Sequence, residues 1–401
     1  MGEQFRSAAL RRQARACATL VTVLAVFGSA SLARAQGLPP IDDRGYAIDL
    51  YQGVVIGSSE IIGQGGAGVA GSEGSVGVLF NPATAAIRPT TTNSSLRATL
   101  HLDWLNAGRK DDLENSGLPH DDASSLLLTG GLSITYKAWS LALTGTTFSF
   151  AKRDDAATEV RLQNAKLAVA RMVARDTIAL GVAVRTGTLG IDAGGETLFE
   201  TSSQALELGG VWLPTGRAYR LGAAMSLPVR RGRVEASSCD PMDCMGYILP
   251  EEVALPPTLR LGAAYRFGPT PWNTRVAAKY RDERHYTVAA DVLLTAPARQ
   301  GAGLGAFLEQ KLQRSGQHTT VNINVGANAE IMPGRLRVRA GSYWEAARLE
   351  NRHGRVHGTA GADWRLFAMR LWSWRFRVRL TATVDVASRY VNSGISLGFW
   401  N

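Results

Sequence analysis

Thirteen consecutive residues near the C-terminus, 374–386, alternate without a break between apolar and polar side chains. The apolar set is Trp374, Phe376, Val378, Leu380, Ala382, Val384 and Val386. The polar set is Arg375, Arg377, Arg379, Thr381, Thr383 and Asp385. Because successive side chains of a β-strand point to opposite faces, this stretch predicts a strand with one apolar and one charged face. Such a strand suits a soluble sandwich, or a transmembrane β-barrel whose apolar face meets lipid.

The first 35 residues have the three parts of a secretory signal peptide. Arginines lie near the start, an apolar stretch runs from Ala16 to Leu32, and Ala33-Arg34-Ala35 forms a small-x-small cleavage site. A membrane anchor is the alternative, but the apolar run is short for a spanning helix. We therefore expect residues 1–35 to be removed and the mature chain to leave the cytoplasm.

The net charge of +10 falls to about +6 when the signal segment is subtracted. In an exported protein this excess does not indicate nucleic acid, and it could concern acidic substrates or anionic lipid head groups. No mature segment approaches the eighteen consecutive apolar residues of a membrane-spanning helix. Since one segment after another repeats the alternation, we predict an all-β fold, a transmembrane antiparallel β-barrel that satisfies its backbone groups in lipid.

We expect about fourteen strands, an even number as is usual for one bacterial chain. Their expected ranges are 94–104, 124–136, 138–150, 162–172, 177–188, 204–213, 218–228, 257–267, 286–296, 318–331, 335–346, 357–368, 374–386 and 391–400. Long connections are expected at 105–123, 189–203, 229–256 and 297–317, and they alternate with short turns. This alternation is typical of membrane barrels. The connection 268–285 should be short in this scheme and is not.

The mature chain keeps two cysteines, Cys239 and Cys244, in the sequence Cys-Asp-Pro-Met-Asp-Cys. In an oxidising compartment, a local disulfide that closes a small loop is the expected arrangement. A metal or redox pair would need closer spacing and further ligands nearby.

No motif indicates an enzyme, a metal or a cofactor. Gly63-x-Gly65-x-x-Gly68 matches the dinucleotide fingerprint, but it lacks the strand and helix that the fingerprint requires around it. His353 and His357 are four residues apart, but the glycines that follow them favour solvated histidines in a hairpin loop. The sequence contains no Gly-x-Ser-x-Gly nucleophile elbow.

A set of arginines lies opposite apolar strand positions: Arg260, Arg266, Arg335, Arg337, Arg339, Arg375, Arg377 and Arg379. An arginine that faces lipid at mid-bilayer costs about 2–4 kcal/mol, so we expect these side chains to face the lumen. They could form a basic path for anionic solutes or fatty carboxylates. For most of them we favour salt bridges within the lumen, to Asp103, Asp291, Asp385 and Glu330.

Three stretches resemble the FadL-type long-chain fatty-acid transporter family of Gram-negative outer membranes. The Gly-rich run Gly63–Gly77, which leads to Asn81-Pro82-Ala83, is similar to the family's N-terminal plug and its Asn-Pro-Ala motif. Pro256–Arg266 and Thr287–Val292 are similar to two successive family strands. The family joins these strands by a short turn, so the longer connection here is a departure.

After the expected signal peptide at 1–35, the resemblance implies a plug at 36–92 with the motif Asn81, Pro82 and Ala83, and a barrel at 93–401. It implies passive uptake of fatty acids or other hydrophobic compounds, with a lateral exit at a kinked strand. The implied partners are membrane lipid, lipopolysaccharide, a hydrophobic small-molecule ligand and the barrel assembly machinery, and the implied state is a monomer. A small-residue segment can physically fill a barrel of about fourteen strands.

Two other functions remain open at this point. A general solute porin would pass polar solutes and would need no plug. A barrel that serves secretion or surface attachment would transport nothing. The Gly-rich N-terminal segment distinguishes the first of these from a plugged transporter.

Overall fold

The structure is a computed structural model that describes residues 37–51, 53–87, 96–107, 112, 114–118, 124–152, 158–235, 239–274, 281–371 and 374–399. The expected signal peptide lies outside these residues. One compact unit, Pro39–Asn401, contains nearly all of them. Among them, no helix is both long enough and apolar enough to cross a membrane.

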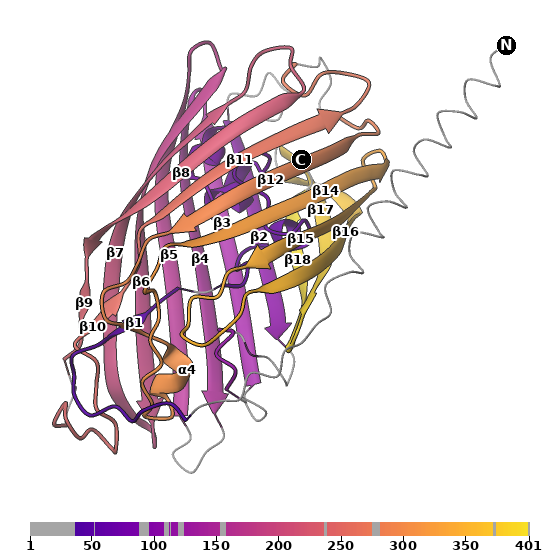
Figure 1. The fold of residues 1–401 in the computed structure, drawn as a ribbon. Helices are drawn as coiled ribbons and strands as arrows, with labels where there is room; N and C mark the ends of the chain where they lie inside the picture. Colours follow the sequence, from indigo (N-terminus) through magenta and orange to yellow (C-terminus); the bar gives the residue numbers. More distant parts are fainter. Residues whose placement is uncertain are drawn as a thin grey trace. The chain divides into compact units, whose positions relative to one another are not determined.

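Fourteen antiparallel strands of the described chain close into a barrel (Figure 1). They are β2 (Leu96–Ala107), β3 (Ser124–Tyr136), β4 (Trp139–Lys152), β5 (Thr158–Val173), β6 (Ile178–Ala193), β7 (Glu196–Trp212), β8 (Tyr219–Arg230), β11 (Thr258–Phe267), β12 (Tyr286–Thr295), β14 (Thr320–Met332), β15 (Leu336–Glu345), β16 (Arg355–Leu371), β17 (Trp374–Ala387) and β18 (Tyr390–Phe399). The barrel closes where β18 pairs with β2. The predicted fourteen-stranded barrel is confirmed.

The outer face of the barrel is apolar and the inner face is polar. Leu143, Trp104 and Leu397 are 58%, 58% and 51% exposed, whereas their inward-facing strand neighbours Thr144 and Asp103 are buried. A soluble protein would bury such large apolar side chains. The arrangement is that of a transmembrane barrel, in which lipid covers the outer face.

Strands β5, β6 and β7 are long, with 16, 16 and 17 residues, and the parts of them nearest the long connections reverse this polarity. Val160 and Ile191 are fully buried inside, while Glu159 and Arg161 form an exposed ion pair outside. The prediction of a long loop at 189–203 is therefore wrong, because strand structure continues to a turn at 194–195. Apolar and polar residues exchange faces here because these residues lie beyond the apolar outer band, so their apolar side chains pack inward.

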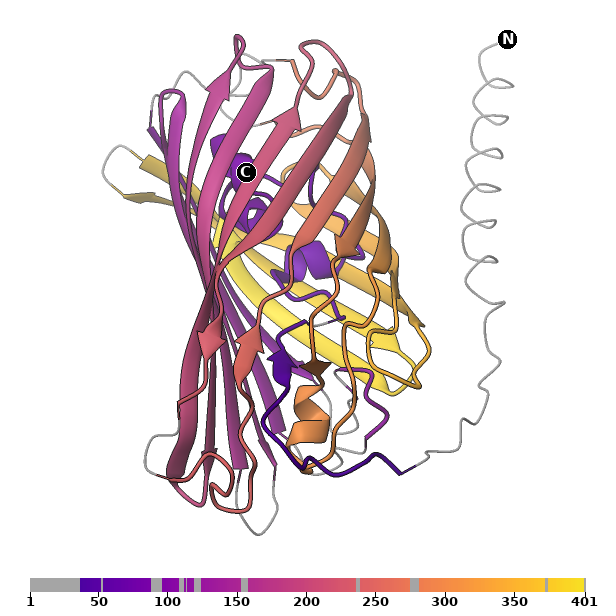
Figure 2. The ribbon, with the colours of Figure 1, turned by 60° about the vertical axis from the view of Figure 1, so that its left-hand side comes forward.

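Long connections gather at one end of the barrel, the lower end in Figures 1 and 2, which we call the loop end. Short turns such as 174–177 and 333–335 lie at the opposite end, which we call the turn end. The loop end holds a four-stranded sheet in the order β13 (Gly301–Ala302), β1 (Ala47–Asp49), β10 (Glu252–Ala254) and β9 (Gly232–Arg233) (Figure 2). Strand β1 is parallel to both neighbours, so the N-terminal chain joins two separate loops.

An apolar core lies beneath this sheet. Phe307 of α4 (Leu304–Phe307) contacts the rings of Tyr46, Phe199 and Tyr247 at centroid distances of 5.5–6.4 Å. The loop that follows β2 reaches the same region, where the Glu114 carboxylate accepts a 3.0 Å hydrogen bond from the Gly305 N–H. The loops at this end are thus packed like a small soluble domain.

Residues 53–87, which we call the inner segment, lie inside the barrel with three short helices, α2 (Ser59–Ile62), α3 (Gly74–Val78) and η1 (Pro82–Ala86) (Figures 1 and 2). Local capping starts two of them. The Ser58 hydroxyl accepts from the Glu60 N–H, and the Asn81 amide oxygen accepts from the Ala83 N–H. Pro82 occupies the first helical position, where no N–H is required.

The long connection 268–285 folds back against the turn end of the barrel. The Arg220 guanidinium lies 3.8 Å from the centre of the Trp272 ring and 2.6 Å from Glu73 of the inner segment. Residues 275–280 of this connection lie outside the described residues. The extra chain at this turn therefore contacts the barrel wall and lies close to the inner segment.

Candidate functional site

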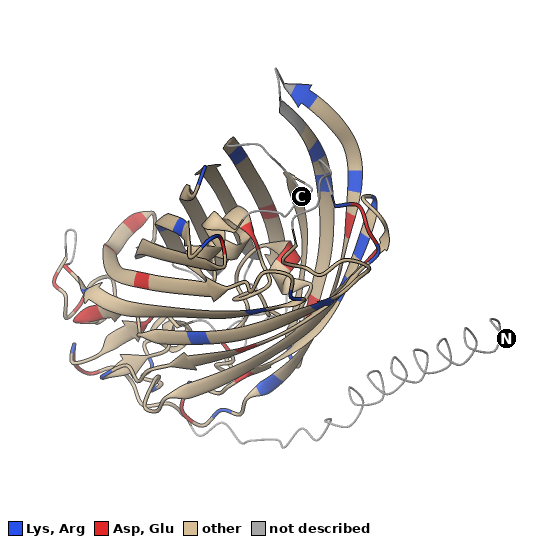
Figure 3. Ribbon diagram, turned by 90° about the horizontal axis from the view of Figure 1, so that it is seen from above, with Lys and Arg blue, Asp and Glu red and all other residues tan. Residues whose placement is uncertain are grey.

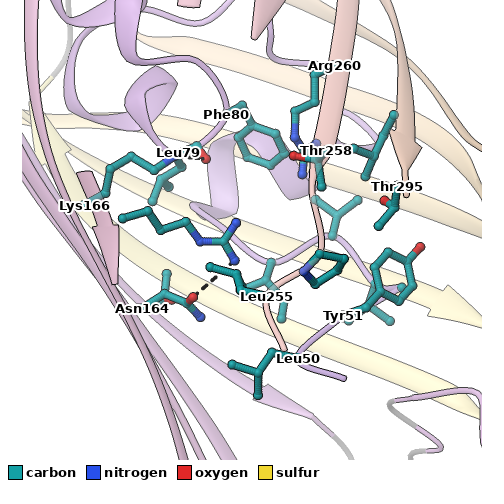
Figure 4. A pocket seen from close by; sticks show the side chains of 18 of the residues that line it. Leu50, Tyr51, Leu79, Phe80, Asn164, Lys166, Leu255, Thr258, Arg260 and Thr295 are labelled. Carbon is teal, nitrogen blue, oxygen red and sulfur yellow. Dashed lines mark hydrogen bonds between the residues drawn. The ribbon is translucent and has the colours of Figure 1, made fainter. Parts of the chain in front are cut away.

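A cavity of about 150 Å³ lies between the inner segment and the barrel wall (Figure 4). The N-terminal chain contributes apolar side chains to it: Leu50, Val54, Val55, Ile56, Leu79 and Phe80. The wall contributes three cations, Lys166, Arg185 and Arg260, together with several threonines and asparagines. The cavity thus combines an apolar surface with a local excess of positive charge.

Only one of these three cations lacks a charged partner among the residues that the structure describes. Glu207 of β7 binds Lys166 at 2.5 Å and lies 3.7 Å from Arg185. Lys166 also donates to the carbonyl oxygens of Val78 and Leu79. Arg260 makes no salt bridge or hydrogen bond with any described residue, and its guanidinium lies 4.8 Å from the centre of the Phe80 ring (Figure 4). Arg260 can therefore meet an anionic group of a ligand.

Gly145 of β4 separates the cavity from the outer face of the barrel. Gly145 lines the inner cavity and also a groove on the outer face, which Leu102, Trp104, Leu128, Ile395 and Leu397 surround. Its paired neighbours are Gly130 on β3 and Ala165 on β5. A Cβ built on Gly145 would meet only the Asn164 carbonyl oxygen, at 3.7 Å. Small residues on three adjacent strands thus leave only backbone between the cavity and the lipid-facing surface.

Carboxylates of the wall hold the backbone of the inner segment. Asp291 of β12 accepts hydrogen bonds from the N–H groups of Gly68 and Val69 at 2.6 and 2.9 Å. Asp103 of β2 accepts from the Ser59 N–H at 2.6 Å, at the start of α2. The expected salt bridges of Asp103 and Asp291 to lumen arginines are therefore absent among the described residues, because backbone N–H groups occupy these carboxylates.

A buried charge cluster ties α2 to strands β15, β16 and β17. The Glu60 carboxylate pairs with Arg379 and lies 3.4 Å from Arg339, and both arginines also pair with Asp363. Burial alone would raise the pKa of Glu60, but the Arg379 and Arg339 guanidiniums outweigh it and hold that pKa below its usual range. Glu60 is therefore ionised and locks the inner segment to the wall.

Glycines of the wall allow the inner segment to approach closely. Gly181 and Gly209 pair directly with each other and lie beneath Asn81, Pro82 and Ala83. A Cβ on Gly181 would lie 2.5 Å from the Ala83 nitrogen. The absence of a side chain at these two positions therefore lets a second stretch of backbone approach the wall closely.

The predicted motif residues Asn81, Pro82 and Ala83 are all buried at this contact. The Asn81 amide donates to the carbonyl oxygens of Val69 and Gly210, so it joins the inner segment to itself and to β7. Further along, the Ala85 carbonyl accepts from Thr135 and Ser140.

The predicted lumen arginines fall into different environments. Arg337 pairs with Glu330 as expected, Arg266 pairs with Glu283, and Arg377 pairs with Asp282. Arg335 lies exposed in the turn 333–335, so its expected place in the lumen is wrong: β15 begins one residue later than predicted. The side chain of Arg375 lies outside the described residues.

His357 does not lie in a solvated loop, as its neighbouring glycines suggested. It is fully buried on β16, where its ring nitrogens lie 2.9 Å from Asp385 and 2.8 Å from Glu345. Tyr343 stacks on its ring at 4.1 Å. Asp385 therefore partners a histidine rather than an arginine. His353 is exposed, as expected.

Cys239 and Cys244 are joined by a disulfide in the connection between β8 and β11. Two cavity residues were missed by the sequence analysis, Lys166 and Arg185. Lys166 is next to the lipid-facing Leu167, and Arg185 is next to the lipid-facing Val184. The same alternation of basic and apolar residues that predicted the lumen arginines could therefore have identified them.

Comparison with known proteins finds no matching family model and no matching curated protein. A Pseudomonas aeruginosa FadL homologue superposes with a TM-score of 0.54 at 13% identity, covering 88% of this chain and 99% of that chain. The CymD monoaromatic hydrocarbon channel superposes with a TM-score of 0.52 at 10% identity, covering 86% of this chain and 96% of that chain. A TodX deltaS2S3 mutant monoaromatic hydrocarbon channel superposes with a TM-score of 0.53 at 13% identity, covering 87% of this chain and 99% of that chain. This chain therefore has the FadL-type β-barrel fold.

Proposed function

We propose that the protein is a passive transporter of hydrophobic compounds in the outer membrane of a Gram-negative cell, with its lumen closed by the inner segment. The observation that carries the proposal is the cavity beside the inner segment, with apolar side chains and one cation that has no charged partner among the described residues. CymD and TodX, which share the fold, are monoaromatic hydrocarbon channels. The apolar outer face and the signal peptide expected from the sequence support a place in the membrane.

Arg260 favours an amphiphile with a carboxylate, such as a long-chain fatty acid. A guanidinium recognises a carboxylate through paired charge-assisted hydrogen bonds. The side chains of Leu79, Phe80 and Leu255 would surround the alkyl chain that follows. Gly145 marks the shortest route from this cavity to the lipid-facing groove, so we place the lateral exit there.

A general porin fits these observations less well. The inner segment occupies the lumen with buried hydrogen bonds and ion pairs, and a water-filled pore needs no such contents. A barrel for secretion or surface attachment would need no cavity lined by a guanidinium that lacks a charged partner among the described residues.

Uptake into proteoliposomes tests the proposal. We expect a labelled long-chain fatty acid to enter faster than in empty liposomes, and sugars to give no osmotic swelling. Arg260→Gln should lower fatty-acid uptake and spare an uncharged alkylbenzene, whereas Arg217→Gln, in an exposed turn, should change neither. Gly145→Leu should slow both hydrophobic compounds, because its side chain fills the outer groove.

Three results would reject parts of this scheme. Rapid swelling in sugars would favour a porin. Failure of every compound to enter would favour a barrel that transports nothing. If Arg260→Gln lowered the uptake of fatty acid and of alkylbenzene equally, Arg260 would not recognise a carboxylate.

A further inference from the structure

The hairpin of β16 and β17 extends beyond its neighbours at the turn end. Strand β15 pairs with β16 only as far as Trp364, and β18 pairs with β17 only from Val378 onward. Residues 366–371 and 374–377, which we call the ribbon, therefore have no strand partner beyond this hairpin among the described residues. Figure 3 shows two strands reaching past the rest of the barrel, with a basic position near their end.

One face of the ribbon continues the apolar outer band. Phe367 pairs with Val378 and Met369 pairs with Phe376, and Val378 belongs to the lipid-facing set of β17. Leu366, Phe367 and Met369 are 49%, 55% and 42% exposed. Phe376 stacks on Phe399 at 4.7 Å and so fixes the ribbon to the last strand. The apolar surface thus extends farther toward the turn end here than on the adjoining strands.

The backbone of the ribbon limits where this apolar face can lie. Both edges of a two-stranded ribbon present N–H and C=O groups without a neighbouring strand, and such groups are too costly in hydrocarbon. Bulk water, in turn, would leave large apolar side chains exposed. The head-group region of a bilayer meets both requirements, because one side is apolar and the other is hydrated.

Arginines surround the base and length of the ribbon. Arg335 is exposed in the neighbouring turn, and its carbonyl oxygen accepts a 2.9 Å hydrogen bond from the Arg365 N–H. Neither Arg335 nor Arg365 forms a salt bridge with any residue that the structure describes. Arg370 is exposed on the ribbon itself. If the apolar face of the ribbon lies in the head-group region, these arginines lie at the level of the lipid phosphate groups and can bind them.

We propose that the ribbon, together with Arg335, is a docking surface for an anionic phospholipid of the leaflet at the turn end. Its acyl chains would cover Leu366, Phe367 and Met369, and its phosphate would meet Arg335 and Arg370. The proposal needs a membrane-embedded barrel but does not depend on which compound the barrel transports.

Native mass spectrometry of the full mature protein in detergent tests this surface. Phosphatidylglycerol and phosphatidylcholine with identical chains are added, and the fraction of protein that retains each is compared. We expect the wild-type protein to favour phosphatidylglycerol. Arg335→Gln/Arg370→Gln should lower that preference by roughly fivefold for each arginine removed. Arg175→Gln/Arg217→Gln removes two exposed arginines from other turns of the same end and should leave it unchanged.

A second variant tests the apolar face. Phe367→Ser/Met369→Ser should lower retention of both lipids and leave their ratio unchanged. Heat-modifiable gel migration checks that each variant is folded. In the wild-type protein, brominated phosphatidylglycerol should quench Trp fluorescence more than brominated phosphatidylcholine at equal content. Equal retention of the two lipids by the wild-type protein, or equal losses in both arginine pairs, would overturn the proposal.

Discussion

Replacing Gly181 with alanine should push the inner segment away from the wall while leaving the barrel intact. The Cβ added by Gly181→Ala would lie 2.5 Å from the Ala83 nitrogen and from the Pro82 carbonyl carbon, both of them backbone atoms that cannot rotate away. Ordinary contacts are about 3.5–4.0 Å, so the inner segment must retreat by roughly 1 Å. The Cβ added by Gly209→Ala would instead meet side-chain atoms, the Asn81 amide oxygen and the Pro82 ring.

The cost of this clash follows from overpacking of a close contact. An extra methyl group in a packed site typically costs about 1–3 kcal/mol. Because the clash exists only when the inner segment is docked, this cost shifts the ratio of docked to released forms by roughly 5- to 150-fold. The strand itself should tolerate the change, because Gly181 has no positive φ angle that alanine would strain.

Gly210→Ala is the matched control. It lies beside Gly209 on β7, and its Cβ would come no closer than 3.7 Å to Leu180. In planar bilayers, Gly181→Ala and Gly209→Ala should raise single-channel conductance, and hydrogen exchange should become faster in residues 74–87. Gly210→Ala should behave as the wild type does. If all three variants conduct and exchange alike, close packing on these glycines does not hold the inner segment in place, and the proposed closure of the lumen loses this support.

Three further outcomes are expected. Glu60→Gln removes the carboxylate that pairs with Arg379 and Arg339. Hydrogen exchange in residues 59–62 should become faster, by an amount equivalent to a loss of about 1.5–3 kcal/mol in the free energy of local opening. Unchanged exchange would contradict the role of this ion pair in holding α2 to the wall. Cys239→Ser should leave heat-modifiable migration unchanged, because the bond to Cys244 closes only a short loop; two free thiols in the isolated wild type would refute the bond. Burial raises the pKa of Glu114 to about 7, although the hydrogen bond from the Gly305 N–H partly offsets this effect. Docking of the loop that carries Glu114 should therefore be strongest below about pH 4.5 and should weaken as the pH rises to 7. Hydrogen exchange compared at pH 5 and pH 8 would show this change, and Glu114→Gln should abolish it.

The barrel could be predicted because each strand carries its own evidence. In 374–386, the alternation of apolar and polar residues identifies both the strand and its lipid-facing side. This inference does not depend on which strands lie beside it. Strand starts and ends in the structure lie within a few residues of the predicted ones for most strands. The exception is instructive: β6 and β7 run on through the predicted loop 189–203, since Leu189 and Ile191 face a core built by other loops.

The glycines show why the interior was harder to predict. Gly181 and Gly210 look alike in the sequence, each a glycine in an alternating strand. Gly181 faces the inner segment and Gly210 faces outward, where a methyl group would find room. The period assigns the face correctly, but only the path of residues 53–87 shows which inward glycines touch another backbone. That path depends on contacts between residues far apart in the sequence.

The arginines carry the same lesson for the candidate site. The pattern correctly placed Arg260, Arg339 and Arg379 inside the barrel, since lipid would be costly for all of them. It could not tell a structural cation from one that is free for a ligand, because that depends on which carboxylate lies nearby. Arg379 faces Glu60, which the inner segment brings to it, whereas Arg260 faces Phe80. The inner segment therefore decides the state of these arginines. Its Glu60 pairs with Arg379 and Arg339, whereas it leaves Arg260 at the edge of the cavity without a charged partner among the described residues.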